Sequence, residues 1–213
     1  MASTRYTIFL LQFFMDILLY THNQGKINEF LTLAAQTNLH LYSAIDKKVH
    51  TGIEETGTTF IENAIIKARD GAKQSGMPCI ADDSGLIVDC LDGKPGLYSA
   101  RYAGKNARDG SNVEKLIHDT SPFPPEKRTA RFYCCIVFLR SENDPCPLIG
   151  EGYFEGLIID KPLGDNGFGY DPIFYLPNLS QTAAQISPED KHKLSHRGKA
   201  LRSLHQQLSS HFM

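Results

Sequence analysis

The stretch Cys79-Ile-Ala-Asp-Asp-Ser-Gly-Leu86 places two adjacent carboxylates at the end of an apolar run. We predict a strand at 79–82, a turn at 83–85 and a second strand at 86–91. Neighbouring carboxylates at the end of a buried strand repel each other, and a divalent cation such as Mg²⁺ removes that cost. Because adjacent side chains on a strand point to opposite faces, one of the two should face a ligand. A turn with a solvated aspartate is the alternative interpretation.

Two helices are expected before this stretch. The first follows a short strand at 17–20, and the second opens with a capping box at 59–62. Apolar residues at the spacing of one helical face define what each helix buries. These positions are Ile27, Phe30, Leu31 and Ala34 in the first helix, and Ile61, Ala64, Ile65 and Ala68 in the second.

The remaining elements follow the same logic towards the C-terminus. We predict a helix at 112–118, an antiparallel hairpin from 131–139 and 148–159, and a strand at 173–176. Ser187 followed by Pro188 has the signature of a helix start. A terminal helix follows, with Leu201, Leu204 and Leu208 on its buried face. Strands that alternate with helices and also pair consecutively predict an α/β fold with a mixed sheet.

Composition limits the function classes. With 213 residues, 41% hydrophobic and 22% charged, the chain suits one globular domain. A net charge of −2 argues against a protein that mainly binds nucleic acid, which usually needs a strong basic excess. Basic residues do gather between Lys191 and Arg202, which fits a small anionic ligand. The five cysteines include no C-x-x-C pair, so we expect reduced thiols and a cytoplasmic protein.

The first fourteen residues carry an apolar segment that is too short to span a membrane. A signal peptide is disfavoured because no small-residue cleavage site precedes the folded pattern. Met15 stands directly before the first strand pattern. We therefore divide the chain into a dispensable extension, 1–14, and a single folded domain, 15–213, with a membrane or export role for the extension as the weaker interpretation.

Three further polar segments lie at the ends of predicted elements, where α/β proteins place ligands. Thr21–Lys26 is a strand-to-helix turn whose backbone N–H groups could attract phosphate, although it lacks the Walker spacing. In Gly167–Pro172 two glycines frame an aromatic ring suited to stacking on a base. Ser195–Lys199, preceded by Lys191, concentrates hydrogen-bond donors. Taken singly, the three also fit an ordinary turn, a turn with a buried phenylalanine and a solvated basic face.

Taken together and in this order, the segments resemble the inosine triphosphate pyrophosphatase family, in particular its bacterial dITP/XTP pyrophosphatase branch. The resemblance extends from Asp16 to Leu208. It also includes the run Glu54-Glu-Thr-Gly-Thr-Thr-Phe-Ile-Glu-Asn-Ala64 and the run Pro95-Gly-Leu-Tyr-Ser-Ala-Arg-Tyr102. A match of this length is specific even though each segment alone is a weak signal.

The resemblance implies two lobes around a central nucleotide cleft, a homodimer, and Mg²⁺-dependent conversion of ITP, dITP and XTP to the monophosphate and pyrophosphate. It implies that Asp83 is the catalytic carboxylate and that Glu55 and Asp83 hold the metal. No stable nucleic-acid or membrane partner is expected. The residues expected to bind the substrate are Thr21, His22, Asn23, Gln24, Gly25, Lys26, Ser84, Phe168, Gly169, Tyr170, Asp171, Lys191, His196 and Arg197.

Within that set, the turn and Lys191 are expected to hold the triphosphate. The base is expected to stack on Phe168 and to be hydrogen-bonded by Asp171, His196 and Arg197. A buried donor aimed at the 6-carbonyl of hypoxanthine or xanthine is left unpaired by adenine, at a cost of roughly 1–3 kcal/mol. One departure stands out, because the family's turn usually reads Thr-Gly-Asn and here His22 replaces the glycine. A histidine is strained where φ is positive, and we expect that this position does not require it.

Two other functions compete with this one. A metal-dependent nuclease acting on deoxyinosine-containing DNA would also use paired carboxylates and Mg²⁺, but the nearly neutral charge and the lack of a long basic stripe disfavour it. A nucleotide sensor that binds without turnover is disfavoured by the intact carboxylates.

Overall fold

A seven-stranded mixed sheet in the order β2-β1-β3-β4-β5-β6-β7 organises the computed structural model, which describes residues 15–34 and 39–212. β2 and β3 lie parallel to β1 on either side of it, and every later neighbour is antiparallel. The mixed α/β sheet predicted from the sequence is therefore confirmed. The strands are β1 (Met15–Leu19), β2 (Leu39–Ser43), β3 (Cys79–Val88), β4 (Thr129–Leu139), β5 (Leu148–Ile158), β6 (Phe174–Leu176) and β7 (Gln181–Thr182).

The predicted turn at 83–85 is wrong, because β3 is one continuous strand. Asp83, Ser84 and Gly85 pair in register with Cys135, Cys134 and Tyr133 of β4. The ladder continues because cationic side chains balance the carboxylates on both faces. Gly85 serves close packing instead of a turn, since a Cβ there would press on the Gly96 carbonyl. β1 pairs with β3 only as far as Ile80, so the rest of that edge is available to the site.

Five α-helices flank the sheet in the described part of the chain. They are α1 (Gln24–Ala34), α2 (Phe60–Ser75), α3 (Asp109–Thr120), α4 (Pro188–Leu194) and α5 (His196–Phe212), with 3₁₀ turns η1 (Asp89–Leu91), η2 (Gly96–Arg101), η3 (Pro125–Lys127) and η4 (Asp171–Ile173). The capping box of α2 is confirmed, since the Thr59 hydroxyl accepts from the Glu62 N–H and the Glu62 carboxylate accepts from the Thr59 N–H. Ser187 caps α4 as predicted. Leu31 is a wrong core assignment, since it is 44% exposed on α1.

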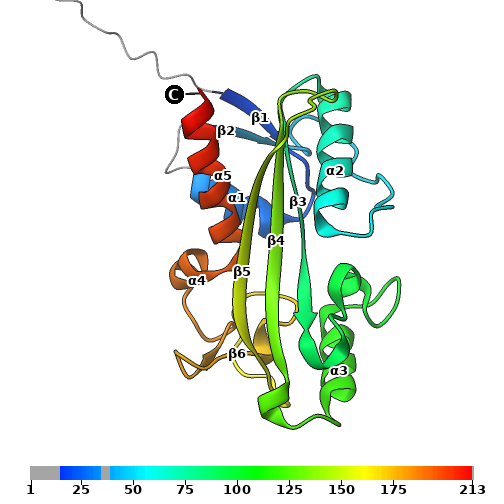
Figure 1. The fold of residues 1–213 in the computed structure, drawn as a ribbon, viewed down its shortest axis with the longest axis vertical. Helices are drawn as coiled ribbons and strands as arrows, with labels where there is room; N and C mark the ends of the chain where they lie inside the picture. The colour runs from blue at the N-terminus through cyan, green and yellow to red at the C-terminus, as the bar shows by residue number, and fades with distance from the viewer. Residues whose placement is uncertain (1–14, 35–38, 213) are drawn as a thin grey trace, which may run out of the picture.

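Three apolar clusters divide the molecule into two lobes (Figure 1). In one lobe, α2 covers one face of the sheet, and α1 and α5 cover the other. In the second lobe, the far ends of β3, β4 and β5 pack with α3 and β6 (Figure 1). The three long strands run through both lobes. The cleft expected from the resemblance lies where the lobes meet.

The terminal helix packs unusually close to the sheet through two glycines of β5. A Cβ on Gly150 or Gly152 would collide with backbone atoms of α5. Leu201, Leu204 and Leu208 are buried beneath the helix, as predicted. This approach places the N-terminus of α5, where His196 stands, against the middle of the sheet.

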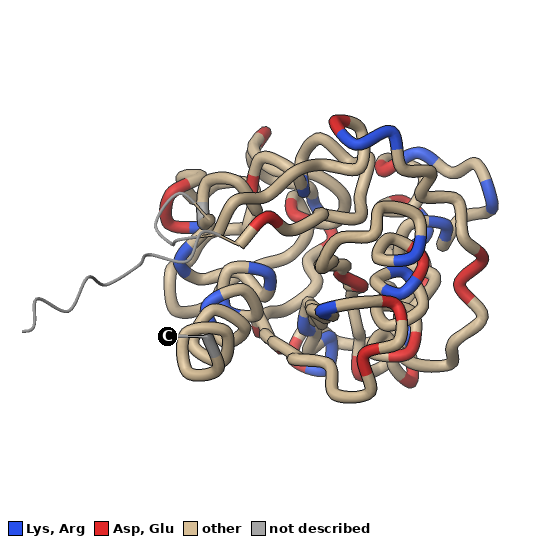
Figure 2. Tube along the Cα trace, turned by 90° about the horizontal axis from the view of Figure 1, so that it is seen from above, with Lys and Arg blue, Asp and Glu red and all other residues tan. Residues whose placement is uncertain are grey.

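Basic and acidic side chains are interspersed along the chain (Figure 2). None of the helices in the described part of the chain combines the length and apolarity needed to span a bilayer. The predicted extension, 1–14, lies outside the described residues.

Candidate active site

A cavity of about 590 Å³ opens between the two lobes, a size typical of nucleotide-sized ligand sites. Most of the residues predicted from the sequence line it: Asn23, Gly25, Lys26, Glu55, Asp83, Ser84, Phe168, Gly169, Tyr170, Asp171, Lys191, His196 and Arg197. They come from α1, the loop before α2, β3, the loop before β6, α4 and α5. The fold thus brings together segments that are far apart in the sequence.

Three predicted residues of the turn lie outside the cavity wall. Thr21 supports the turn, because its hydroxyl accepts from the Asn23 N–H at 3.1 Å. Gln24 donates to Asn28 along α1. His22 turns towards the loop that precedes α2, where its ring contacts Val49. Its φ is not positive, so the expectation that this position tolerates a histidine is confirmed.

The cavity-facing carboxylate of β3 is held by α2. Lys67 Nζ lies 2.9 Å from Asp83 Oδ1 and 3.0 Å from Glu55 Oε1, so one ammonium bridges both carboxylates. Asn63 donates to Asp83 Oδ2 at 3.3 Å. Burial raises the pKa of Asp83 above its usual range, with Lys67 opposing that shift. Burial lowers the pKa of Lys67, but the surrounding carboxylates outweigh it and keep the group charged.

The other carboxylate, Asp82, lies on the opposite face and is only 3% exposed. Lys26 Nζ lies 2.9 Å from Asp82 Oδ2, and Arg197 Nε lies 3.7 Å from the same oxygen. Burial would raise the pKa of Asp82, but Lys26 and Arg197 reverse this and hold it well below its usual range. Arg197 also pairs with Glu29 of α1. A buried network of alternating charges therefore links α1, β3 and α5 beneath the cavity.

The loop before β6 presents its aromatic ring as predicted. Gly167 and Gly169 have φ of 79° and 60°, which glycine adopts without strain. Between them Phe168 stays 45% exposed and lines the cavity. Asp171 holds this loop, accepting from the Phe168 N–H at 2.8 Å and from Lys191 Nζ at 2.5 Å. Lys191 also lies 4.9 Å from the centre of the Phe168 ring, so its described contacts are with the predicted base loop.

His196 stands at the start of α5 with its ring stacked on Phe132, the centroids 5.0 Å apart and the planes 12° apart. Burial lowers the pKa of His196 well below its usual range, and Arg197 and Lys191 act in the same direction. The ring is therefore neutral at pH 7. Its Nδ1 is buried and has no hydrogen-bond partner among the described residues, so it is available to a ligand.

Sequence reasoning missed Lys67, Asn63, Glu29 and Phe132, all of which line the cavity or hold a residue that does. Asn63 and Lys67 are four residues apart, which places them on one face of α2 directly after the acidic loop. That spacing was a usable signal. Glu29 and Phe132 offered none, because their partners lie far away in the sequence.

The donor set fits a small hard cation. Mg²⁺ commonly binds through one or two carboxylates, waters and substrate phosphates, and Glu55 and Asp83 supply two carboxylates at one point of the cavity. In the described residues no group of three or more candidate ligands forms a complete protein site.

The chain is similar in sequence and in fold to several known proteins. The chain is 52% identical to a dITP/XTP pyrophosphatase of Photobacterium profundum, over 88% of this chain and 95% of the relative. It superposes on a HAM1 protein of Coxiella burnetii with a TM-score of 0.86 and 45% identity, over 92% of this chain and 99% of that one. A dITP/XTP pyrophosphatase structure from Mycobacterium abscessus gives a TM-score of 0.73 at 40% identity, over 89% of this chain and 98% of that one. A family model matches residues 17–207, and the chain belongs to the Ham1 family.

Proposed function

We propose that this protein is a hydrolase that converts ITP, dITP and XTP to the monophosphate and pyrophosphate. One observation carries the proposal: a single cleft combines a carboxylate pair bridged by Lys67 with a buried, neutral His196. The first feature suits chemistry on a triphosphate, and the second suits recognition of an uncharged base. The chain's relatives named dITP/XTP pyrophosphatase support the same reaction.

In this reaction a water attacks the α-phosphorus and pyrophosphate leaves. Phosphoryl transfer needs positioning and charge neutralisation more than covalent help from the protein. Asp83 orients the attacking water and accepts its proton, a role for which a raised pKa is suitable. Lys67 fixes the direction of that carboxylate and contributes positive charge. The start of α1, at Gly25 and Lys26, lines the cavity, where the positive end of the helix and the Lys26 ammonium favour the phosphates.

Glu55 and Asp83 would hold Mg²⁺, which shields phosphate charge and lowers the pKa of bound water. We propose Mg²⁺ because these carboxylates are hard oxygen donors and incomplete as a set. The protein's own contribution is to keep both carboxylates at the cavity wall. Lys67 balances their charge when no divalent ion is bound.

The base is proposed to stack on Phe168 and to be recognised by Asp171, His196 and Arg197. The unpaired Nδ1 of His196 supports this, because a buried polar atom without a partner favours a ligand that supplies one. Since adenine has an amine where hypoxanthine has a carbonyl, at least one of these groups would lose its partner with ATP. ATP is therefore expected to react more slowly than ITP.

We further propose that the protein acts in the cytoplasm as a homodimer. The cytoplasm is proposed because the sequence has no paired cysteine pattern, and the five cysteines of the described structure are unpaired. Sedimentation at micromolar concentration would test the dimer, for which twice the chain mass of 23.8 kDa is expected.

The decisive experiment is a panel of nucleoside triphosphates with Mg²⁺, with products separated by anion-exchange chromatography. ITP should give IMP and pyrophosphate, whereas IDP and orthophosphate would contradict the assignment. Duplex DNA containing deoxyinosine is included in the same panel. Nicking without ITP hydrolysis would favour the nuclease, and tight ITP binding without products would favour a sensor.

A further inference from the structure

His22 stands in the phosphate turn, yet its side chain contacts a different segment. Its Nε2 lies 3.1 Å from the Val49 carbonyl oxygen, and its Nδ1 lies 3.1 Å from the Thr51 hydroxyl. Both ring nitrogens are therefore engaged by the loop that joins β2 to α2. The function proposed above does not use these contacts.

The carbonyl partner fixes the direction of one hydrogen bond, and the neutral form of the imidazole then fixes the other. A carbonyl oxygen only accepts, so Nε2 of His22 carries the proton and donates to Val49. Nδ1 then accepts from the Thr51 hydroxyl. The turn is thus joined to the loop by a matched donor and acceptor, which a glycine at this position cannot provide.

His50, which lies between these two partners, is held from the other side by α2. Gln74 accepts from the His50 N–H at 3.0 Å and donates to the His50 carbonyl at 2.8 Å. Val49 itself is buried. Residues 49–51 therefore form an anchor point clamped between the phosphate turn and α2.

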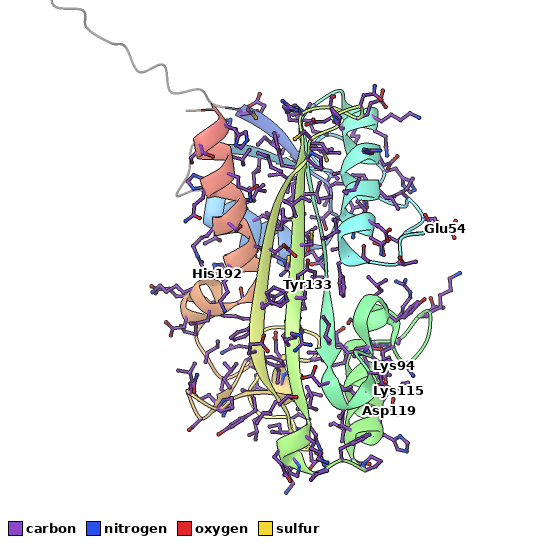
Figure 3. All side chains as sticks on the ribbon, in the orientation of Figure 1. Glu54, Lys94, Lys115, Asp119, Tyr133 and His192 are labelled. Atoms are coloured by element: carbon purple, nitrogen blue, oxygen red, sulfur yellow. The ribbon has the colours of Figure 1, made fainter. Side chains whose placement is uncertain are left out.

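The arm that follows this anchor carries Glu55. Along this arm, the Ile53 backbone interacts with the Tyr20 hydroxyl, and the Gly57 N–H donates to Asn63 at 2.8 Å. Glu54, one residue before the cavity-lining glutamate, extends away from the body of the molecule on this loop (Figure 3). The position of Glu55 thus depends on the anchor at residues 49–51, on these two contacts along the arm, and on Lys67.

We infer that His22 is a positioning residue that sets the spacing between the phosphate turn and the arm bearing Glu55. Lys26 and Glu55 line the same cavity. A triphosphate bound there would contact the phosphate turn and the arm at the same time, so its binding depends on the distance between them. In the binding mode proposed above, the base stacks on Phe168 and does not depend on that spacing. The identity of the nucleotide rests on the proposed function. The hydrogen bonds of His22 to Val49 and Thr51, here called the latch, are a property of the described structure.

The test compares His22→Ala with wild type and with His22→Gln, whose amide can both donate and accept. Binding is measured by calorimetry with Mg²⁺, using α,β-methylene ITP and, separately, IMP. Losing two modest hydrogen bonds should weaken binding of the triphosphate analogue about three- to tenfold. Binding of IMP should change less than twofold, and the glutamine should restore most of the loss. Equal weakening for both nucleotides, or no weakening, would overturn the inference.

Two further measurements need no nucleotide. Amide hydrogen exchange over residues 49–56 should become faster in His22→Ala and in Thr51→Val. It should stay unchanged in His50→Ala, a loop histidine whose described hydrogen bonds use only its backbone. The double variant of His22 and Thr51 should exchange no faster than His22→Ala alone. Unchanged exchange in His22→Ala would overturn the inference that His22 positions this loop. A wild-type protein that fails to release pyrophosphate from ITP would overturn only the proposed function.

Discussion

Two neighbouring aspartates of β3 have separate tasks because the strand pleat points them to opposite faces. Asp83 faces the cavity beside Lys67, and Asp82 faces the buried cations of α1 and α5. The sequence correctly predicted that the two would diverge. It did not reveal that Asp82 forms buried ion pairs with Lys26 and Arg197, because these two residues are far from it along the chain.

Asp83→Asn should lower kcat for ITP by at least about 10²-fold, the lower range for a positioned acid–base group. The amide keeps the size of the side chain but cannot accept a proton or hold a cation as well. Binding of α,β-methylene ITP should fall much less, because Lys26 and Lys191 remain. Steady-state kinetics and calorimetry measure the two effects. Near wild-type turnover in this variant, with a folded but inactive Asp82→Asn, would invert the two roles.

Asp82→Asn should instead lower the free energy of unfolding by about 3–5 kcal/mol, because it leaves buried cations without their partner. Urea denaturation followed by circular dichroism measures this. Asp92→Asn is the matched control, since Asp92 is exposed and its left-handed backbone suits asparagine. A loss no greater than the control's would mean that Arg197 and Lys26 are satisfied without Asp82.

His196 should make the fold sensitive to mild acid. Burial lowers its pKa in the folded state, whereas the unfolded chain has the ordinary value near 6.5. Below about pH 6.5 the unfolded chain therefore binds the proton first, and stability falls as pH decreases towards the folded-state pKa. The slope should approach about 1.4 kcal/mol per pH unit. Urea unfolding between pH 7.5 and 5.5 should show this slope in wild type and a shallower one in His196→Gln.

At the scale of elements, the contact between α5 and β5 determines where the base-reading side chains stand. Gly152→Ala should push the start of α5 away from the sheet, because the new methyl group would meet the His196 carbonyl and the Ala200 N–H. We expect a melting temperature several degrees lower and a higher KM for ITP. Gly110→Ala in the first turn of α3 is the control, since its Cβ would meet open space. Equal behaviour of the two variants in thermal unfolding and kinetics would contradict this role.

Elements with a strong local signal were predicted well from the sequence, and those that depend on tertiary partners were not. The capping box of α2 and the β4–β5 hairpin are encoded by adjacent residues and are confirmed. The break predicted in β3 was wrong, because Asp83 and Gly85 look like turn residues until Lys67 and η2 are placed beside them. The strand β2 was not predicted. It pairs with β1 in parallel and is separated from it by a helix, so no neighbouring hairpin partner signals it.

At the scale of the whole molecule, the candidate site was predicted in its parts and not in its arrangement. The resemblance supplied most of the residues that line the cavity. It could not show that His22 turns outward or that Lys191 contacts Asp171 and Phe168, because both depend on how distant loops pack.

Removing residues 1–14 should leave ITP hydrolysis and the melting temperature nearly unchanged. The family match begins at residue 17 and the sheet begins at Met15, so no described element is lost. The full chain and a chain starting at Met15 would be compared by calorimetric melting and steady-state kinetics. A marked decrease in either quantity would show that the extension contributes to the fold.

The short pairing between β1 and β3 has a consequence for the order of folding. The β4–β5 hairpin joins neighbouring segments, whereas Leu18 and Leu19 must find Cys79 and Ile80 across a long intervening chain. Contacts that close long loops form late, because the entropy lost in closing them is recovered only afterwards. The cavity needs both kinds of contact. Catalysis should therefore be the last property to return on refolding, after most of the secondary structure is already in place.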